Sequence, residues 1–330
     1  MSDIPNRSEI LFLYDIENAN PNGDPNDENK PRIDEETGKN IVTDVRLKRT
    51  VRDWFSLTGK DIFVREKTYD ADGHIQDGKL RAADYLPKDK EKLAPCTAEE
   101  QKQLISEAIL NECIDVRLFG ATIPLDLKVS DGKKIKSVKG AITYTGPVQF
   151  KMGKSLHSVK MKYIKGTGAF ASKKNTTQKT FREEYILSYS LISFYGVVNE
   201  NAAKHTKLKS EDVNLLKQAI WNGTKGLISR SKFGQMPRLL LIVNYNSPNF
   251  FIGDLDNLIS LDSEKRDEEI RKPEEYSVDI THLLGKFKDH KDKIETIEFM
   301  TDSRMSYRDG ADKVELRDLD KFTDKSKEVQ

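Results

Sequence analysis

Two short segments of this chain are apolar at almost every position, and they restrict the folds that it can adopt. Residues 10–16 read ILFLYDI and residues 238–245 read RLLLIVNY. A strand with one face in solvent alternates apolar and polar residues, so these runs predict strands that are buried on both faces. Residues 184–198 predict a third, longer strand with partial alternation. The chain is therefore expected to fold around a sheet that is covered on both sides.

Two amphipathic helices are predicted between these strands. The first is capped by Thr43 or Asp44, and the second by Ser210, where acidic residues in the first turn favour the helix dipole. With a further strand expected at residues 61–67, the order becomes strand, helix, strand, then strand, helix, strand. This is the order of the ferredoxin-like sheet of RNA-recognition domains. The predicted fold class is α+β, a modified RNA-recognition-motif sheet with long inserts, among them a helix at 98–112 and a hairpin at 124–140.

Charge is concentrated in one part of the chain. Residues 132–182 contain 13 Lys and Arg and no acidic residue, although 54 of the 330 residues are Asp or Glu. The flanking parts are acidic, at −8 for residues 1–131 and −7 for residues 252–330, so the net charge of +1 conceals a polarised molecule. A localised cationic segment of this kind usually binds a polyanion, most often nucleic acid. Acidic flanks around a basic centre also favour contacts between copies of the chain.

Three groups of basic residues are candidates for phosphate contacts. They lie in the first helix, in the basic insert, and in a second acid-free stretch before the last buried strand. The candidates are Arg46, Lys48, Arg49, Arg52, Lys133, Lys134, Lys136, Lys139, Lys151, Lys154, Lys160, Lys162, Lys165, Lys173, Lys174, Arg230, Lys232 and Arg238. Lysine-dominated charge meets phosphates as point charges and is blind to sequence. His157 lies in the same insert and is a further candidate for RNA contact.

Other classes of function find little support in the sequence. The N-terminus is polar and no apolar run reaches the length of a membrane helix, so a cytoplasmic protein without membrane contact is expected. Cys96 and Cys113 are too few for a disulfide framework and too far apart for a zinc site. Neither a phosphate-binding GxxxxGK[ST] motif nor a catalytic histidine motif occurs. We therefore expect no cofactor, no metal and no enzymatic activity.

Several blocks of sequence together resemble one known family. They are residues 18–25 (NANPNGDP), 31–34 (PRID), 37–38 (TG), 42–49 (VTDVRLKR), 115–121 (DVRLFGA) and 231–239 (SKFGQMPRL). They are similar to the backbone subunit, of the RAMP superfamily, in the type I CRISPR surveillance complex Cascade, most like its subtype I-B form. The resemblance spans roughly residues 8–246.

The resemblance implies a hand-shaped protein that stacks in several copies into a helical filament along CRISPR RNA. It implies a palm at residues 1–68 and 184–250, an inserted finger region at 69–149, a thumb-like hairpin at 150–183, and a C-terminal subdomain or interaction region at 251–330. The helix with Arg46 and Arg52 would hold guide phosphates, and Met152 and Phe170 of the thumb are candidate wedges that displace a base. Further partners would be the target DNA strand, the large subunit and the subunit that binds the 5′ handle.

Two alternatives stay open. Related subunits of type III complexes cleave RNA with an aspartate before this helix, and Asp34 has a similar context, with Asp24 and Asp27 near enough in sequence to share a metal. Carboxylates in such a loop are more often turn formers. The second alternative is an RNA-binding protein that acts alone, which a fixed RNA footprint occupied by several copies would exclude.

Overall fold

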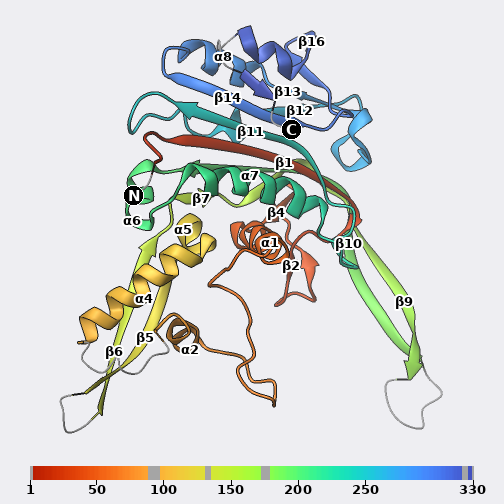
Figure 1. Cartoon of the computed structure of the whole chain (residues 1–330). Coiled ribbons are helices and arrows are strands. Elements are labelled where there is room, and N and C mark those ends of the chain that lie inside the picture. Colours follow the sequence, from red (N-terminus) through yellow and green to blue (C-terminus); the bar gives the residue numbers. More distant parts are fainter. Residues whose placement is uncertain (1–2, 88–96, 131–134, 172–178, 322–325, 329–330) are drawn as a thin grey trace. The chain divides into compact units, whose positions relative to one another are not determined.

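The computed structural model describes residues 3–87, 97–130, 135–171, 179–321 and 326–328 (Figure 1). The chain divides into two compact units, each built from several segments. Unit 1 consists of residues 1–5, 51–149 and 198–219, and unit 2 of residues 6–50, 150–197 and 220–330. The protein is a mixed α/β structure, and among the described helices none is both long and apolar enough to span a membrane.

The described elements are as follows. The strands are β1 Ser8–Ala19, β2 Gly23–Asp24, β3 Lys30–Pro31, β4 Lys39–Val42, β5 Gly120–Ser130, β6 Ile135–Thr145, β7 Val148–Phe150, β8 Gly153–Ser158, β9 Met161–Ala171, β10 Lys179–Val198, β11 Met236–Tyr245, β12 Ser260–Asp262, β13 Ser277–Asp279, β14 Ile294–Thr301, β15 Tyr307–Asp309, β16 Asp312–Val314 and β17 Ser326–Glu328. The helices are α1 Asp44–Leu57, α2 Gly78–Ala83, α4 Ala98–Glu112, α5 Ile114–Phe119, α6 Glu200–Thr206, α7 Ser210–Lys225 and α8 Thr281–Asp289, with short 3-10 helices η1 Leu255–Leu258, η2 Asp267–Glu269, η3 Pro273–Glu275 and η4 Leu316–Lys321.

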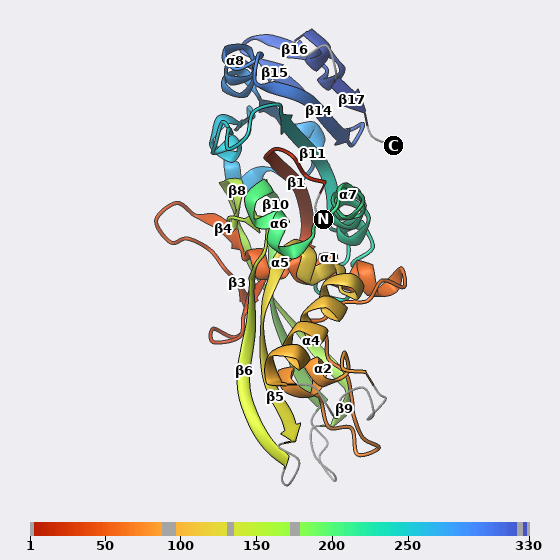
Figure 2. The same cartoon turned by 60° about the vertical axis from the view of Figure 1, so that its left-hand side comes forward.

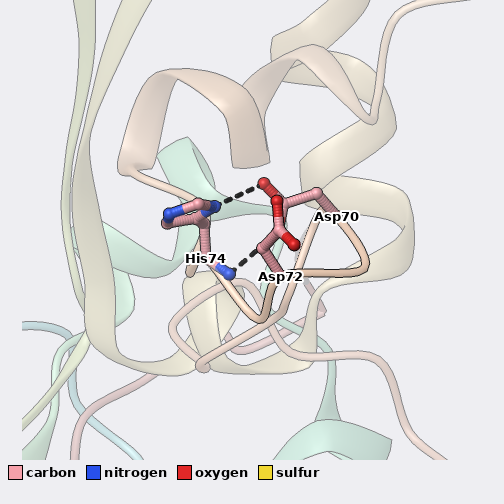
Figure 3. Close-up of side chains that lie close together, drawn as sticks. All are labelled: Asp70, Asp72 and His74. Atoms are coloured by element: carbon pink, nitrogen blue, oxygen red, sulfur yellow. Dashed lines mark hydrogen bonds and ion pairs between the residues drawn. The ribbon is translucent and has the colours of Figure 1, made fainter.

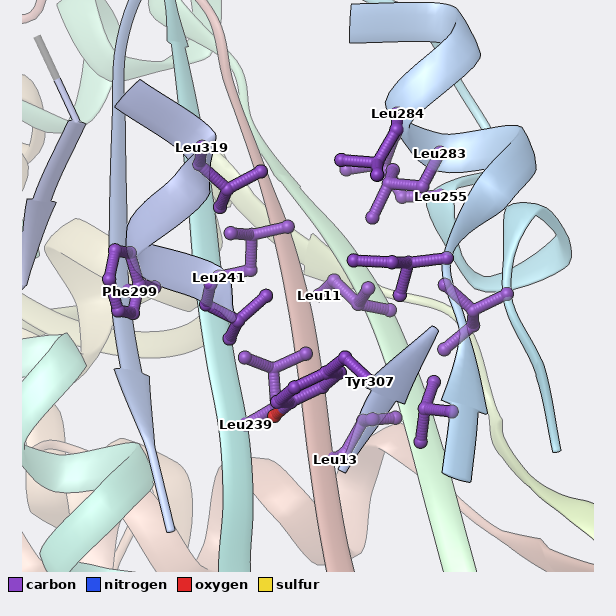
Figure 4. Packing of buried hydrophobic residues seen from close by; sticks show 14 of the residues in the cluster. Leu11, Leu13, Leu239, Leu241, Leu255, Leu283, Leu284, Phe299, Tyr307 and Leu319 are labelled. Carbon is purple, nitrogen blue, oxygen red and sulfur yellow. The ribbon is translucent and has the colours of Figure 1, made fainter. Parts of the chain in front are cut away.

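Unit 2 is organised by a sheet whose strands follow the order β17, β14, β11, β1, β10, β8, β4. The pairs of β11 with β1 and with β14 are antiparallel, whereas β17 joins β14 in parallel. β1 is buried along its first nine residues, which confirms the prediction of a strand covered on both faces. Its residues Leu11 and Leu13 contribute to a core that also contains Leu239, Leu241 and Phe299 (Figure 4).

Unit 1 contains the β5–β6 hairpin, which pairs from Gly120 with Thr145 out to Ser130 with Ile135. Helices α2 and α4 lie along this hairpin (Figures 1 and 2). The predicted hairpin is thus confirmed and is longer than expected. α4 begins and ends where the sequence predicts, because Thr97 and Glu100 form a reciprocal capping box at its start.

The strand predicted at residues 61–67 is wrong, since this described stretch belongs to no strand. Its backbone amides are satisfied by a side chain instead. Asp115, fully buried, accepts hydrogen bonds from the amides of Phe63 at 2.7 Å and Val64 at 3.1 Å. Arg52 Nε lies 3.0 Å from the same carboxylate and balances its charge. Once those amides have partners, no neighbouring strand is needed to hold the segment.

Candidate nucleic-acid interface

The basic segment at residues 132–182 is divided between the two units and contributes to a hairpin in each. Its first part forms β6, the second strand of the β5–β6 hairpin in unit 1, where Lys136 and Lys139 are exposed. Its last part forms the β9–β10 hairpin in unit 2, which pairs from Leu187 with Met161 out to Lys179 with Ala171. Figure 1 shows this second hairpin extending beyond the rest of the sheet of unit 2. Lys133, Lys134, Lys173 and Lys174 lie outside the described residues.

The β9–β10 hairpin carries different chemistry on its two faces. Side chains alternate across a strand, so Lys162 and Ile164 lie on one face, and Met161, Tyr163 and Lys165 on the other. All five are exposed. Lys165 is 3.5 Å from Glu183 on the opposite strand, whereas Lys162 lies 3.3 Å from the side-chain oxygen of Asn18. The backbone of Phe170 belongs to β9, but its side chain lies outside the described residues, so its role as a wedge stays a prediction.

Tyr185, on β10, joins the hairpin to the loop that follows β1. Its ring lies 5.2 Å from the ring of Tyr163 and 5.2 Å from the ammonium of Lys30. Its hydroxyl donates a 3.0 Å hydrogen bond to Glu28. Asn20 braces the same loop by donating to the carbonyl of Asn29 at 2.7 Å. The sequence did not identify Tyr185, because its partners are set by strand register and not by spacing along the chain.

A cavity of about 560 Å³ lies between this loop and the start of the hairpin, within unit 2. Met152 and Met161 line one side of it, and residues of the loop line the other. The exposed fraction of Met152 is 57% and that of Met161 is 39%, so both thioether side chains are accessible. Only glycine fits at position 153, next to Met152, because a Cβ atom there would lie 2.6 Å from Cζ of the buried Phe194 ring. We call this cavity the methionine pocket.

The basic helix α1 is less exposed than predicted. Arg49 is exposed, but Arg46, Lys48 and Arg52 are half-buried and have partners within the protein. Arg46 donates to Thr50 at 3.0 Å, Lys48 lies 3.0 Å from Asp44, and Arg52 binds Asp115 as described above. An arginine whose carboxylate partner is fully buried is held away from solvent phosphates. Arg52 is therefore better explained as a structural residue.

The candidate cations in and after the basic loop before β11 also differ in their exposure to solvent. Arg230 is exposed and lies 3.1 Å from Glu184. Lys232 donates to the carbonyl of Asn20 at 3.3 Å, and burial together with the nearby charge of Arg46 lowers the pKa of its ammonium. Arg238 is buried and paired with Asp15 at 2.8 Å. The assignment of Arg238 to a phosphate-binding surface is therefore corrected, because its guanidinium does not reach solvent.

The two remaining lysines before the hairpin also differ. Lys154 is exposed on β8. Lys151 forms ion pairs with Asp254 and, at 3.2 Å, with Asp256. Burial opposes the charge of Lys151, but these hydrogen bonds prevail and raise its pKa. A phosphate would have to displace two carboxylates from Lys151, so Lys154 is the more accessible of the pair.

His157 does not face solvent, which corrects the prediction that it contacts RNA. Its side chain is buried, with Nδ1 lying 2.8 Å from the carbonyl oxygen of Ser158 and Nε2 accepting the amide of Leu191 at 3.2 Å. A carbonyl only accepts, so Nδ1 carries the proton and the ring is neutral. Burial lowers the pKa of His157 from 6.5.

This geometry predicts that acid destabilises the protein through His157. Between the lowered pKa of the folded state and about 6.5, the unfolded chain binds the extra proton, so stability rises with pH. The contribution is complete above about pH 6.5 and is lost as the pH falls below it. Urea unfolding between pH 7.5 and 5.5 measures this effect. The free energy of unfolding should fall more steeply with falling pH for the wild type than for His157→Gln, by at most about 1.4 kcal/mol per pH unit. Parallel curves for the two proteins would contradict this assignment.

Asp34, the candidate catalytic residue, forms a local turn. Its carboxylate accepts the hydroxyl of Thr37 at 2.9 Å and the amide of Glu36 at 3.2 Å, and these hydrogen bonds lower its pKa. Asp24 pairs with Arg32 at 2.6 Å, and Asp27 with Lys30 at 2.7 Å. Among the described residues, these three carboxylates do not meet in a group that could hold a metal.

One group of side chains among the described residues is close enough to hold a metal ion. It consists of Asp70, Asp72 and His74, all exposed (Figure 3). Local bonding explains it. Asp70 accepts the amide of His74 at 2.9 Å, and its other oxygen lies 2.6 Å from Nδ1 of the same residue. Gly73, with a φ of +86°, completes the tight turn. Asp70 therefore acts as a turn former here.

The chain matches one family of known proteins over most of its length. The family described as CRISPR-associated protein Cas7 matches residues 6–281. A protein of Haloferax volcanii named CRISPR-associated protein Cas7 is 34% identical over 315 residues, covering 91% of this chain and 88% of that protein. The chain belongs to the Cas7 family. Among solved structures, a chain of a "CRISPR RNA-guided surveillance complex, pre-nicking" is similar to this one, with a TM-score of 0.47 and 14% identity over 90% of this chain and 93% of that chain. A chain of another "CRISPR RNA-guided surveillance complex" has a TM-score of 0.46 and 12% identity over 90% of this chain and 89% of that chain.

Proposed function

We propose that this Cas7 protein is the backbone subunit of a type I CRISPR surveillance complex, in which copies stack along the guide RNA and present it to target DNA. Membership of the family carries this proposal. The exposed cations of the β9–β10 hairpin support it, because a positively charged surface attracts the phosphates of a single strand. The subunit recognises RNA geometry, and base pairing supplies specificity. It is not an enzyme in this proposal and acts in the cytoplasm.

The finer fold assignment is also part of the proposal. β1 lies between β10 and β11 in the sheet, α1 follows β1, and α7 precedes β11. This order supports an RNA-recognition-like palm. The β9–β10 hairpin is the proposed thumb, and the β5–β6 hairpin with α4 belongs to the proposed finger region. The neighbouring copies, the large subunit and the subunit at the 5′ handle are the proposed protein partners.

Charge reversal on the hairpin tests the proposal. Replacing Lys160, Lys162 and Lys165 with Glu should weaken binding to single-stranded RNA and make it less dependent on salt. The slope of log K against log salt should fall by about 0.7 for each phosphate that the variant no longer neutralises. Fluorescence anisotropy at several salt concentrations measures this slope. Lys162→Glu alone should have a larger effect than Lys165→Glu, because Glu183 already pairs with Lys165.

The matched control reverses three exposed lysines elsewhere, Lys286, Lys288 and Lys291. That variant has the same net charge, and its salt slope should equal that of the wild type. If both triple variants had an unchanged slope, RNA would bind on a different surface. If both slopes fell equally, net charge alone would be responsible, and the proposed hairpin surface would be wrong.

A further inference from the structure

Two carboxylates at the start of η1 hold one lysine of the basic insert. Asp254 and Asp256 both bind the ammonium of Lys151, Asp256 at a distance of 3.2 Å. The ammonium also lies 4.9 Å from the centre of the Tyr195 ring, and the amide of Lys151 donates to the carbonyl of Tyr195 at 2.8 Å. One positive charge therefore has two negative charges and the face of an aromatic ring around it.

The two carboxylates are held in place by contacts that do not involve Lys151. Leu255, which lies between them in the sequence, is fully buried in the core of unit 2. Glu9, also fully buried, accepts hydrogen bonds from the amides of Ile252 and Gly253 at 2.8 Å each. Gly253 and Asp254 have φ of +88° and +52°, and a residue other than glycine keeps this conformation only where the surrounding structure fixes it. The fold thus presents both carboxylates to the lysine at defined positions.

The contact between Lys151 and the carboxylates is open to solvent. The side chain of Lys151 is 42% exposed and that of Asp254 is 64% exposed. Exposed ion pairs contribute little to stability and are screened by salt, so a competing anion can replace one partner. A phosphate meets an ammonium as a point charge, as a carboxylate does. Met152 and Lys154, which follow Lys151, are exposed, so this part of the basic insert is accessible to a nucleic acid strand.

We propose that Asp254 and Asp256 compete with RNA phosphates for Lys151 and form an autoinhibitory contact that weakens RNA binding. In the free protein the two carboxylates occupy the ammonium, and a bound strand exchanges them for a phosphate. The exchange lowers the affinity for every RNA sequence alike, because a phosphate contact carries no sequence information. This inference rests on the proposed function, because it requires that RNA binds to the chain.

A double-mutant cycle tests the competition. Lys151→Met is introduced into the wild type and into the double variant Asp254→Asn, Asp256→Asn, and the affinity of each full chain for oligouridylate is measured by anisotropy. In the double variant no carboxylate holds the ammonium, so Lys151→Met should weaken binding about tenfold, as expected for the loss of a hydrogen bond between charged groups. In the wild type the loss should be only about twofold, because RNA no longer has to break the ion pairs. Equal losses in the two backgrounds would overturn the competition, since independent sites give additive effects.

The matched control is the double variant Glu264→Gln, Glu274→Gln. It removes the same net charge from two exposed carboxylates of unit 2 that lie elsewhere in the sequence. In this background Lys151→Met should weaken binding about twofold, as in the wild type. A tenfold loss here would show that net charge, and not the contact with Lys151, controls the effect, and the inference would be wrong.

Acetylation of lysines in the presence and absence of RNA, followed by mass spectrometry, shows directly whether Lys151 meets the strand. In the variant Asp254→Asn, Asp256→Asn, RNA should protect Lys151 as well as Lys162 of the hairpin. Protection of Lys162 with full reactivity of Lys151 would overturn the inference and leave the proposed function standing. Absence of any RNA binding by the wild type would instead overturn the proposed function itself.

Discussion

Replacing Arg238 with Met should lower the free energy of unfolding by about 3–5 kcal/mol. Arg238 Nη2 lies 2.8 Å from Asp15 Oδ2, and both side chains are only 4% exposed. The substitution would leave the buried carboxylate of Asp15 without its cation, although Tyr189 would still donate to it at 2.7 Å. Urea unfolding at pH 7.5, followed by circular dichroism, measures the effect.

The pH dependence of this loss identifies its cause. Burial raises the pKa of Asp15, and Arg238 counteracts that rise. Without Arg238 the folded carboxyl should protonate at a higher pH. The penalty should therefore be complete above that pKa and shrink as the pH falls through it, because a protonated Asp15 needs no cation. A pH-independent loss would indicate a packing defect instead.

Two controls separate burial from charge. Arg266 is exposed and pairs with Glu269, so Arg266→Met should leave the free energy of unfolding nearly unchanged. The double variant Asp15→Leu, Arg238→Met removes both charges and should recover most of the loss. The single variant, under conditions where it is folded, should also keep the salt slope of RNA binding. A reduced slope would return Arg238 to the phosphate-binding surface.

Arg238 also shows what the sequence could not reveal about the candidate site. The apolar run that begins at Arg238 correctly predicted a buried strand. The acid-free stretch around it suggested a phosphate ligand, because a sequence does not show which carboxylate lies across the sheet. Arg52 was misassigned for the same reason, since its partner Asp115 is 63 residues away. Lys160 and Lys162, in contrast, are exposed, and the acid-free basic segment that contains them was enough to identify them as candidates.

The fold was predictable where local signals dominate. Helix α4 carries its own capping box, and β1 and β11 are apolar along most of their length. The segment at residues 61–67 was mistaken for a strand because its amides bond to the distant Asp115. The methionine pocket was not predictable as a unit. Its lining comes from two segments that lie far apart in the sequence, residues 24–43 and residues 152–161, and no local signal specifies that they meet.

Replacing Glu9 with Ala should destabilise the protein by about 3 kcal/mol or more, since it leaves several buried donors without their acceptor. Glu9 is fully buried on β1. Its carboxylate accepts hydrogen bonds from the hydroxyls of Tyr195 and Tyr245 and from the amides of Ile252 and Gly253, the last two at 2.8 Å. Because all four donors share this one carboxylate, the loss should exceed that of Tyr245→Phe, which removes one donor to a charged group and should cost about 1.5–3 kcal/mol. Urea unfolding of the two variants measures the difference.

The effect of Glu9→Ala should extend to the methionine pocket. Glu9 holds the segment that leads into Asp254 and Asp256, and these residues bind Lys151, the neighbour of Met152. Hydrogen exchange should therefore accelerate at the amides of Ile252 and Gly253. Unchanged protection of these two amides would show that the loop is held without Glu9.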